Sequence, residues 1–171
     1  MRSAVPPGSS PRRVTVRRAN PGEFVDCIRV AHAAWPDFAE RNSIYHLFTK
    51  YFTDTSVVAD ADGQIVGFVF GFQAGVAPPI GYLHLVAVDP AHQRAGVATR
   101  LYEEVFAVLR SRGCRVVRCI VNPENSRSLR FHTGMGFVPT PSGPTVAIGG
   151  VEATRDYNGP GSHMVEFERP L

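Results

Sequence analysis

The chain has 171 residues, a length typical of one globular domain that buries its core without disulfide or metal support. Hydrophobic residues make up 44% and charged residues 19% of it, which excludes an acidic disordered chain. The net charge of +3 leaves a nucleic-acid partner open, although the excess of Arg over the single Lys50 is typical of coding bias.

The first half of the sequence predicts a basic tail followed by one strand and two helices. Residues 1–12 show no hydrophobic pattern and are expected to be a disordered basic tail, with one domain over residues 13–171. Strand signals begin at Val14–Val16. Asn20 and Pro21 are typical of a helix start and precede apolar residues at helical spacing, and a weaker helical stretch covers Ile44–Phe52.

The second half alternates strands with helices, which predicts a mixed sheet rather than a purely parallel one. The expected strands are Thr55–Ala59, Ile65–Phe72, Tyr82–Val88, Val116–Val121, one beginning at Phe137, and Met164–Glu168 after a Gly/Pro-rich loop. Asp62-Gly63 indicates a tight hairpin between the first two of these. Helices are expected over Gly96–Arg112, ended by Gly113, and over Ser126–Thr133.

The most informative segment is the entry into the helix that follows the strand ending at Val88. Ala95, Gly96 and Ala98 keep side chains small, so a ligand can approach several backbone N–H groups there. The first four N–H groups of a helix are unpaired and carry partial positive charge, which suits phosphate, and Arg94 and Arg100 can add charge-assisted bonds. An ordinary strand-to-helix turn remains the alternative.

Two motifs in this order carry a family resemblance. Gln93-Arg94-Ala95-Gly96-Val97-Ala98 resembles the Q/R-x-x-G-x-G/A signature of the GNAT acetyltransferases. Asn125-Ser126-Arg127-Ser128-Leu129-Arg130-Phe131-His132-Thr133-Gly134-Met135-Gly136-Phe137 resembles the family's N-x-x-S/A-x-x-F-Y/H-x-x-x-G-F segment. The resemblance covers about residues 13–171. It departs from the family pattern at Ala98, where the second glycine is replaced but an N–H is still offered.

The resemblance implies a GNAT fold of the α/β class. A mixed sheet of about 6–7 strands, flanked by about four helices, would split into a V between its fourth and fifth strands. Acetyl-coenzyme A would lie in the V, and no metal is expected. The cofactor-binding residues implied are the strand edge Val86, Ala87 and Val88, the loop Gln93, Arg94, Ala95, Gly96, Val97, Ala98 and Thr99, and downstream Asn125 and His132.

Catalytic candidates follow from what acetyl transfer to an amine requires, which is deprotonation of the amine and protonation of the departing thiolate. His132, at a position where family members have tyrosine or histidine, is the leading acid; a neutral histidine that caps its helix or contacts the cofactor is the alternative. His84 is expected on one strand face with Tyr82, Val86 and Val88, as the base or as a half-buried sheet histidine.

Other polar residues have weaker claims. Asp37 and Glu40 can receive the amine or simply be solvated carboxylates. Asn125 can bind pantetheine or cap its own short helix. Cys27, Cys114 and Cys119 form no CxxC pair, so free buried thiols in a reducing compartment are expected, and a cysteine nucleophile is disfavoured.

The sequence therefore predicts an acetyl-CoA-dependent N-acetyltransferase that acts on a primary amine of a small molecule, amino acid or peptide by direct attack. A non-catalytic acyl-CoA sensor and a protein N-terminal or lysine acetyltransferase are the alternatives. Residues 1–18 hold five Arg and no acid, residues 94–130 carry +5, and the rest carries −7, which weakens the nucleic-acid reading. With no signal peptide and no apolar run long enough to span a bilayer, we expect a cytoplasmic protein without a membrane partner, and an exposed strand is compatible with a homodimer.

Overall fold

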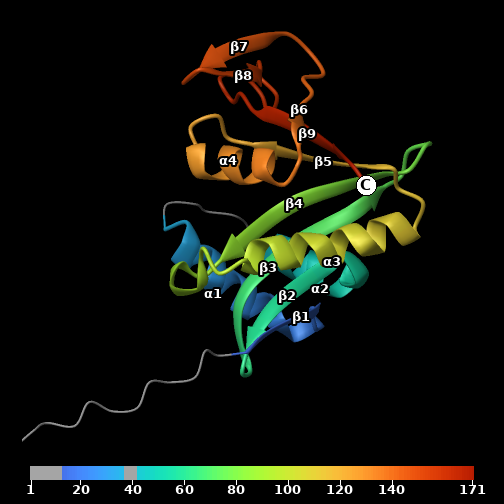
Figure 1. Ribbon diagram of the computed structural model, residues 1–171, viewed down its shortest axis with the longest axis vertical. Coiled ribbons are helices and arrows are strands. Elements are labelled where there is room, and N and C mark those ends of the chain that lie inside the picture. Colours follow the sequence, from blue (N-terminus) through green and yellow to red (C-terminus); the bar gives the residue numbers. More distant parts are fainter. Residues whose placement is uncertain (1–12, 37–41) are drawn as a thin grey trace, which may run out of the picture.

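The described residues, 13–36 and 42–171, form a mixed sheet with four α-helices in this computed structural model (Figure 1). In sheet order the strands are β1 (Val14–Arg18), β2 (Ser56–Ala61), β3 (Gln64–Ala74), β4 (Ile80–Val88), β5 (Val116–Val121), β9 (Val165–Pro170) and β6 (Val138–Pro139). The helices are α1 (Phe24–Ala34), α2 (Asn42–Tyr51), α3 (Val97–Ser111) and α4 (Ser126–Gly134). The expected mixed sheet is confirmed, whereas the tail predicted over residues 1–12 lies outside the described residues.

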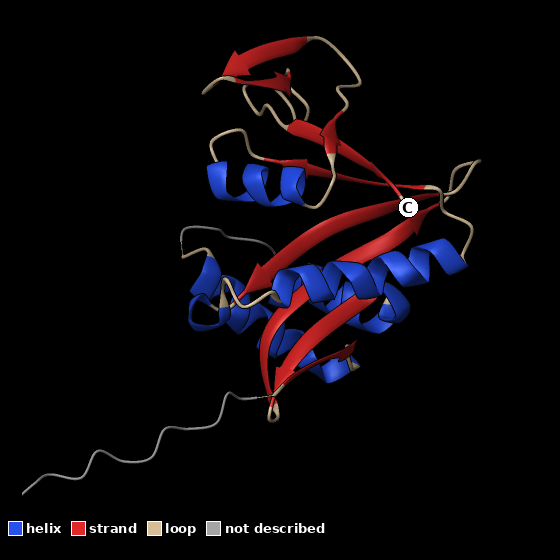
Figure 2. Cartoon of the chain, in the orientation of Figure 1, coloured by secondary structure: helices blue, strands red, loops and turns tan. Residues whose placement is uncertain are grey.

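Helix α3 covers one face of the β1–β4 half of the sheet, and α1 and α2 cover the other (Figure 2). In β2 the side chains of Val57 and Ala59 pack in the core under α3, whereas Val58 packs in the core under α1 and α2. A strand buried on both faces has a continuous hydrophobic run, which explains why the sequence shows little alternation there. The α3 stripe that includes Leu101 and Leu109 is buried as its spacing predicts.

The sheet splits between β4 and β5, which is the one parallel pair among its neighbouring strands. These two strands pair at only two positions, Gly81 with Val117 and Tyr82 with Arg118. Beyond Tyr82 they diverge, and Figure 1 shows them close together at one end and apart at the other. The V between the fourth and fifth strands that the family resemblance implies is therefore present.

A β-bulge interrupts β4 at His84. Leu83 is opposite Gly71 and Leu85 is opposite Phe70, so His84 is the additional residue of the bulge. The bulge resets the alternation of faces: the ring of His84 stacks on Phe48 of α2, whereas Val86 and Val88 pack in the core under α3. The prediction that His84 shares a face with Val86 and Val88 is wrong for this reason.

A second hairpin lies in the stretch that the sequence analysis assigns to a Gly/Pro-rich loop. Strands β7 (Thr145–Ile148) and β8 (Val151–Thr154) pair antiparallel and form a separate two-stranded sheet. Gly149 and Gly150 join them with φ of 57° and 83°, the left-handed conformation that both central residues of a type I′ turn require. The Gly-Gly pair between two β-prone tetrapeptides was the signal that could have found this hairpin.

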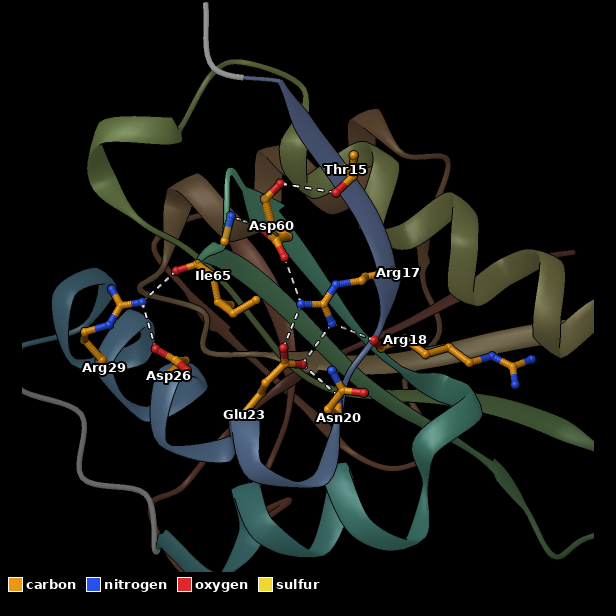
Figure 3. A network of polar contacts seen from close by, with 10 residues as sticks. Thr15, Arg17, Arg18, Asn20, Glu23, Asp26, Arg29, Asp60 and Ile65 are labelled. Carbon is orange, nitrogen blue, oxygen red and sulfur yellow. Dashed lines mark hydrogen bonds and ion pairs between the residues drawn. The ribbon is translucent and has the colours of Figure 1, made fainter.

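An ionic cluster ties the edge strand β1 to its surroundings (Figure 3). The guanidinium of Arg17 donates to both carboxylate oxygens of Glu23, at 2.7 and 3.0 Å, and to Asp60 of β2 at 2.8 Å. Glu23 also accepts from the backbone N–H of Asn20, which precedes the short 3-10 helix η1 (Pro21–Glu23). Arg17 holds the pKa of Glu23 and of Asp60 below their ordinary values.

The three cysteines have the surroundings that the sequence predicts. Cys27, Cys114 and Cys119 are all buried and free, as expected. In the described residues, no helix is long and apolar enough to cross a membrane.

Candidate functional site

The site begins at the open edge of β4. Within the described part of the chain, its last six residues have β3 on one side and no strand on the other, because pairing with β5 ends at Tyr82. The carbonyl of Val88 points to the open side, where it accepts a hydrogen bond of 2.8 Å from the Gln93 side chain. Backbone groups alternate in direction along an antiparallel strand, so Val86 also faces the split and Ala87 faces β3. Two of the three residues predicted at this edge thus offer backbone groups to a ligand.

The loop from Val88 leads into α3 through a left-handed turn. Gly96 is the N-cap residue of α3 with φ of 73°, and Arg94 is also left-handed at 62°. The first helical hydrogen bond runs from the N–H of Arg100 to the carbonyl of Gly96 at 3.1 Å, which leaves the preceding N–H groups of α3 without helical partners. Gly96 has no side chain to cap them, and among the described residues no atom other than those of Gly96 and its chain neighbours lies within 4 Å of where its Cβ would be.

Gln93 and Val97 hold this loop in place from two sides. The amide of Gln93 donates to Val88 at the end of β4 and accepts a hydrogen bond of 2.8 Å from Arg127 of α4. Val97, with 3% of its surface exposed, anchors the start of α3 in the core. The backbone N–H groups between these two anchors therefore have a fixed direction before any ligand binds, which lowers the entropic cost of binding.

The charge around the loop is positive. Arg94, Arg100, Arg127 and Arg130 are exposed, and none of the four forms an ion pair with a carboxylate in the described part of the chain. Together with the partial charge of the helix start, these guanidinium groups favour a ligand with several phosphate charges. Within the described residues, 13–36 and 42–171, no group of three or more His, Cys, Asp or Glu side chains is arranged to hold a metal ion.

Comparison with known proteins identifies the family of this chain. Residues 24–137 match the acetyltransferase (GNAT) family. The chain belongs to the GNAT acetyltransferase family. It is 31% identical to the L-2,4-diaminobutyric acid acetyltransferase of Nocardia farcinica over 85 residues, which are 50% of this chain and 44% of that protein. It is 29% identical over 159 residues to the mycothiol acetyltransferase of a Nocardioides species, covering 80% of this chain and 54% of that protein.

A solved structure supports the same GNAT fold. The diaminobutyrate acetyltransferase of Paenibacillus lautus, in complex with L-2,4-diaminobutyric acid and coenzyme A, superposes with a TM-score of 0.74. That alignment covers 94% of this chain and 96% of the other at 22% identity. The chain spans about half the length of the two curated relatives above, so their activities are not transferred to it by similarity alone.

His132 of this GNAT chain lies in the core, with 3% of its surface exposed. Its Nδ1 is 2.8 Å from the carbonyl oxygen of Ser128, so this nitrogen carries the proton, and its Nε2 accepts from the hydroxyl of Tyr102 at 2.9 Å. The ring stacks on Phe167 and meets Phe137 edge-on. Burial lowers the pKa of His132, and the hydrogen bond to Ser128 opposes this only in part.

This environment argues against the prediction that His132 is the acid. A general acid must be protonated and must reach the leaving group, whereas His132 is held neutral with both nitrogens engaged. Burial also raises the pKa of Tyr102, which therefore remains a hydroxyl donor to the histidine. The alternative, a neutral structural histidine, fits these contacts better.

The remaining candidates have different surroundings. His84 is exposed on the α2 side of β4 and stacks on Phe48, with ring centroids 5.2 Å apart. Asn125 caps α4, because its side-chain oxygen accepts from the N–H of Ser128 at 3.0 Å; its contact with pantetheine stays a prediction. Asp37 and Glu40 lie outside the described residues.

Two tyrosines that the sequence analysis did not single out meet where the strands part. The side chain of Tyr82, at the last position paired with β5, is close enough to Tyr157, from the loop after β8, for the two phenols to interact electrostatically. Burial raises the pKa of Tyr82, and the neighbouring Tyr157 raises it further, so this phenol stays protonated. No local signal marks this pair, because its members are 75 positions apart and meet only through the fold.

Proposed function

We propose that this chain transfers the acetyl group of acetyl-CoA to a primary amine by direct attack in a ternary complex. The observation that carries the proposal is the edge of β4 on which no described strand pairs, which leads directly to a helix start without a side-chain cap and with exposed arginines nearby. An extended chain with amides and a polyanionic end fits these two features in that order. Acetyl-CoA has this form and supplies an activated thioester.

Different residues bind different parts of acetyl-CoA. The backbone groups of Val86 and Val88 can pair with the amides of pantetheine as an added strand does. The N–H groups from Val97 to Thr99, aided by Arg94, face the pyrophosphate. Positioning of this kind can lower the barrier by as much as about 7–11 kcal/mol, more than the roughly 10²–10⁴-fold that a general acid or base contributes.

For proton transfer we propose His84 as the base. His84 is exposed on the face of β4 that is turned toward α2. His132, in contrast, is buried against Tyr102 of α3. The group that leaves is an alkyl thiolate, the class to which free cysteine with a pKa of about 8.5 belongs, and it departs readily, so a dedicated acid assists the reaction without being essential. Direct attack is favoured over an acetylated cysteine because burial raises the pKa of Cys27 and of Cys119, which keeps both as unreactive thiols.

We propose a small cationic amine as the acceptor. The relatives named for diaminobutyric acid and the solved complex with that amine support this class. The negative charge of the sequence outside residues 1–18 and 94–130 also favours a cation. A cytoplasmic location agrees with the three free thiols, and a homodimer stays a prediction.

A thiol-release screen tests the proposal. The whole chain is mixed with acetyl-, propionyl- and succinyl-CoA and a panel of diamines, amino acids, neutral amines and short peptides, and each product is confirmed by mass spectrometry. We expect acetylation of amines with net positive charge. Tight acetyl-CoA binding without any acetylated product would instead identify a sensor, and turnover of peptides alone would identify a protein acetyltransferase.

A further inference from the structure

One side-chain contact spans the mouth of the V. Arg127 projects from α4, on the β5 half of the molecule, and donates to the side-chain oxygen of Gln93, on the β4 half, at 2.8 Å. The two strands are no longer paired at this end, so the contact joins the halves where the sheet itself does not. A deeper contact between α4 and α3, His132 to Tyr102, is fully buried. Arg127 and Gln93 thus form the outer closure of the cleft.

The geometry fixes where the guanidinium lies. Both ends of the Gln93 amide are in use, since its nitrogen donates to Val88 and its oxygen accepts from Arg127. Because Gln93 precedes the helix start by three residues, this contact holds Arg127 beside the loop that carries Gly96. The position is set by two hydrogen bonds and does not depend on a flexible surface side chain alone.

The chemistry of the contact leaves Arg127 available to an anion. A guanidinium has five N–H donors, and the neutral amide of Gln93 accepts only one bond. Arg127 has no carboxylate partner in the described residues, so no internal ion pair has to break when an anion arrives. Phosphate is a stronger acceptor for Arg than a neutral amide and takes two parallel bonds.

We propose that Arg127 is a phosphate-contacting residue that closes the mouth of the cleft over the 3′-phospho-ADP part of coenzyme A. The proposal rests on the proposed function and deepens it, because it assigns recognition of the nucleotide end to α4 as well as to the loop before α3. Arg127 keeps its bond to Gln93 and directs its remaining N–H groups to a phosphate oxygen.

The test compares Arg127→Gln with the wild-type chain on acetyl-CoA, acetyl-dephospho-CoA and S-acetylpantetheine, by titration and by steady-state rates. We expect an increase of about tenfold in Kd and KM for acetyl-CoA with kcat nearly unchanged, and no change for S-acetylpantetheine, which has no nucleotide. A loss that persists with acetyl-dephospho-CoA identifies the pyrophosphate as the contact, and a loss confined to acetyl-CoA identifies the 3′-phosphate.

Two variants control the test. Arg127→Lys keeps the charge and should recover part of the affinity, whereas Arg110→Gln removes an exposed arginine at the far end of α3 and should change nothing. An unchanged Kd in Arg127→Gln, or an equal loss with S-acetylpantetheine, would overturn the role of Arg127 and leave the proposed function intact. Absence of acetyl-CoA binding in the wild-type chain would overturn both.

Discussion

At the scale of single residues, His132 shows that a motif position does not determine the surroundings of its side chain. The motif aligns it with tyrosines and histidines of the GNAT family, but Tyr102, Phe137 and Phe167 enclose it here. These neighbours come from α3 and from strands distant in sequence, so the local pattern could not predict the burial. His132 therefore contributes to packing and to a satisfied buried hydrogen-bond pair.

The variant His132→Phe separates structure from catalysis. We expect kcat to stay within about twofold of the wild type, whereas loss of a general acid would lower it about 10²–10⁴-fold. The free energy of unfolding should fall by about 1–3 kcal/mol, because Tyr102 loses its acceptor inside the core. Steady-state rates together with urea unfolding at pH 7.5 measure both effects, and a large loss of kcat in a folded variant would restore His132 as the acid.

The stability of the same variant should also depend on pH differently from that of the wild type. Since burial lowers the pKa of His132 in the folded state, the unfolded chain binds the proton more readily, and wild-type stability falls as pH drops below about 6.5. In His132→Phe that part of the decline should be missing, so the stability difference between the two proteins narrows toward pH 5. A constant difference would mean that His132 titrates equally in both states.

At the scale of elements, the sequence pattern predicted those helices and strands whose bounds depend on residues close together in the sequence. The periodicity of α3 and the apolar run of β5 gave bounds close to those observed, because each depends on residues near in sequence. The bulge at His84 depends on its register with β3 and could not be predicted from β4 alone. The β7–β8 hairpin was missed although Gly149-Gly150 marked its turn.

The edge strand β1 owes part of its attachment to Arg17. Its partners Glu23 and Asp60 have lowered pKa values, so their contribution to stability is present above their unfolded pKa values, near 4, and is lost as pH falls through the folded ones. With the Arg17 side chain 36% exposed, solvent limits the effect. Arg17→Met should cost about 1 kcal/mol at pH 7, and this cost should shrink as pH falls through the lowered pKa values of Glu23 and Asp60, measured by urea unfolding.

The control for this cluster is Arg13→Met, an exposed arginine that precedes β1. Its stability should equal that of the wild type at every pH. If Arg17→Met and Arg13→Met behaved alike, the network in Figure 3 would contribute nothing measurable.

At the scale of the whole molecule, the charge of +3 is a sum of unlike parts. Exposed arginines gather around the start of α3 and the first turns of α4, at the end of the sheet where β4 and β5 are no longer paired. The open edge of β4 and the split could be expected from the family resemblance, but the bridge from Gln93 to Arg127 could not, because it joins segments that meet only in the folded chain. A basic cleft of this form suits an anionic acyl carrier better than a nucleic acid.

Titration with acetyl-CoA tests the central claim most directly, with wild type compared with Gly96→Glu and Gly96→Asn. Gly96 is left-handed, a conformation that Asn tolerates better than most residues, so Gly96→Asn controls for backbone strain without adding charge. We predict that Gly96→Asn retains most of the affinity and that Gly96→Glu weakens it at least about 100-fold, because a carboxylate would face the pyrophosphate. Wild-type affinity in a folded Gly96→Glu variant would contradict the account.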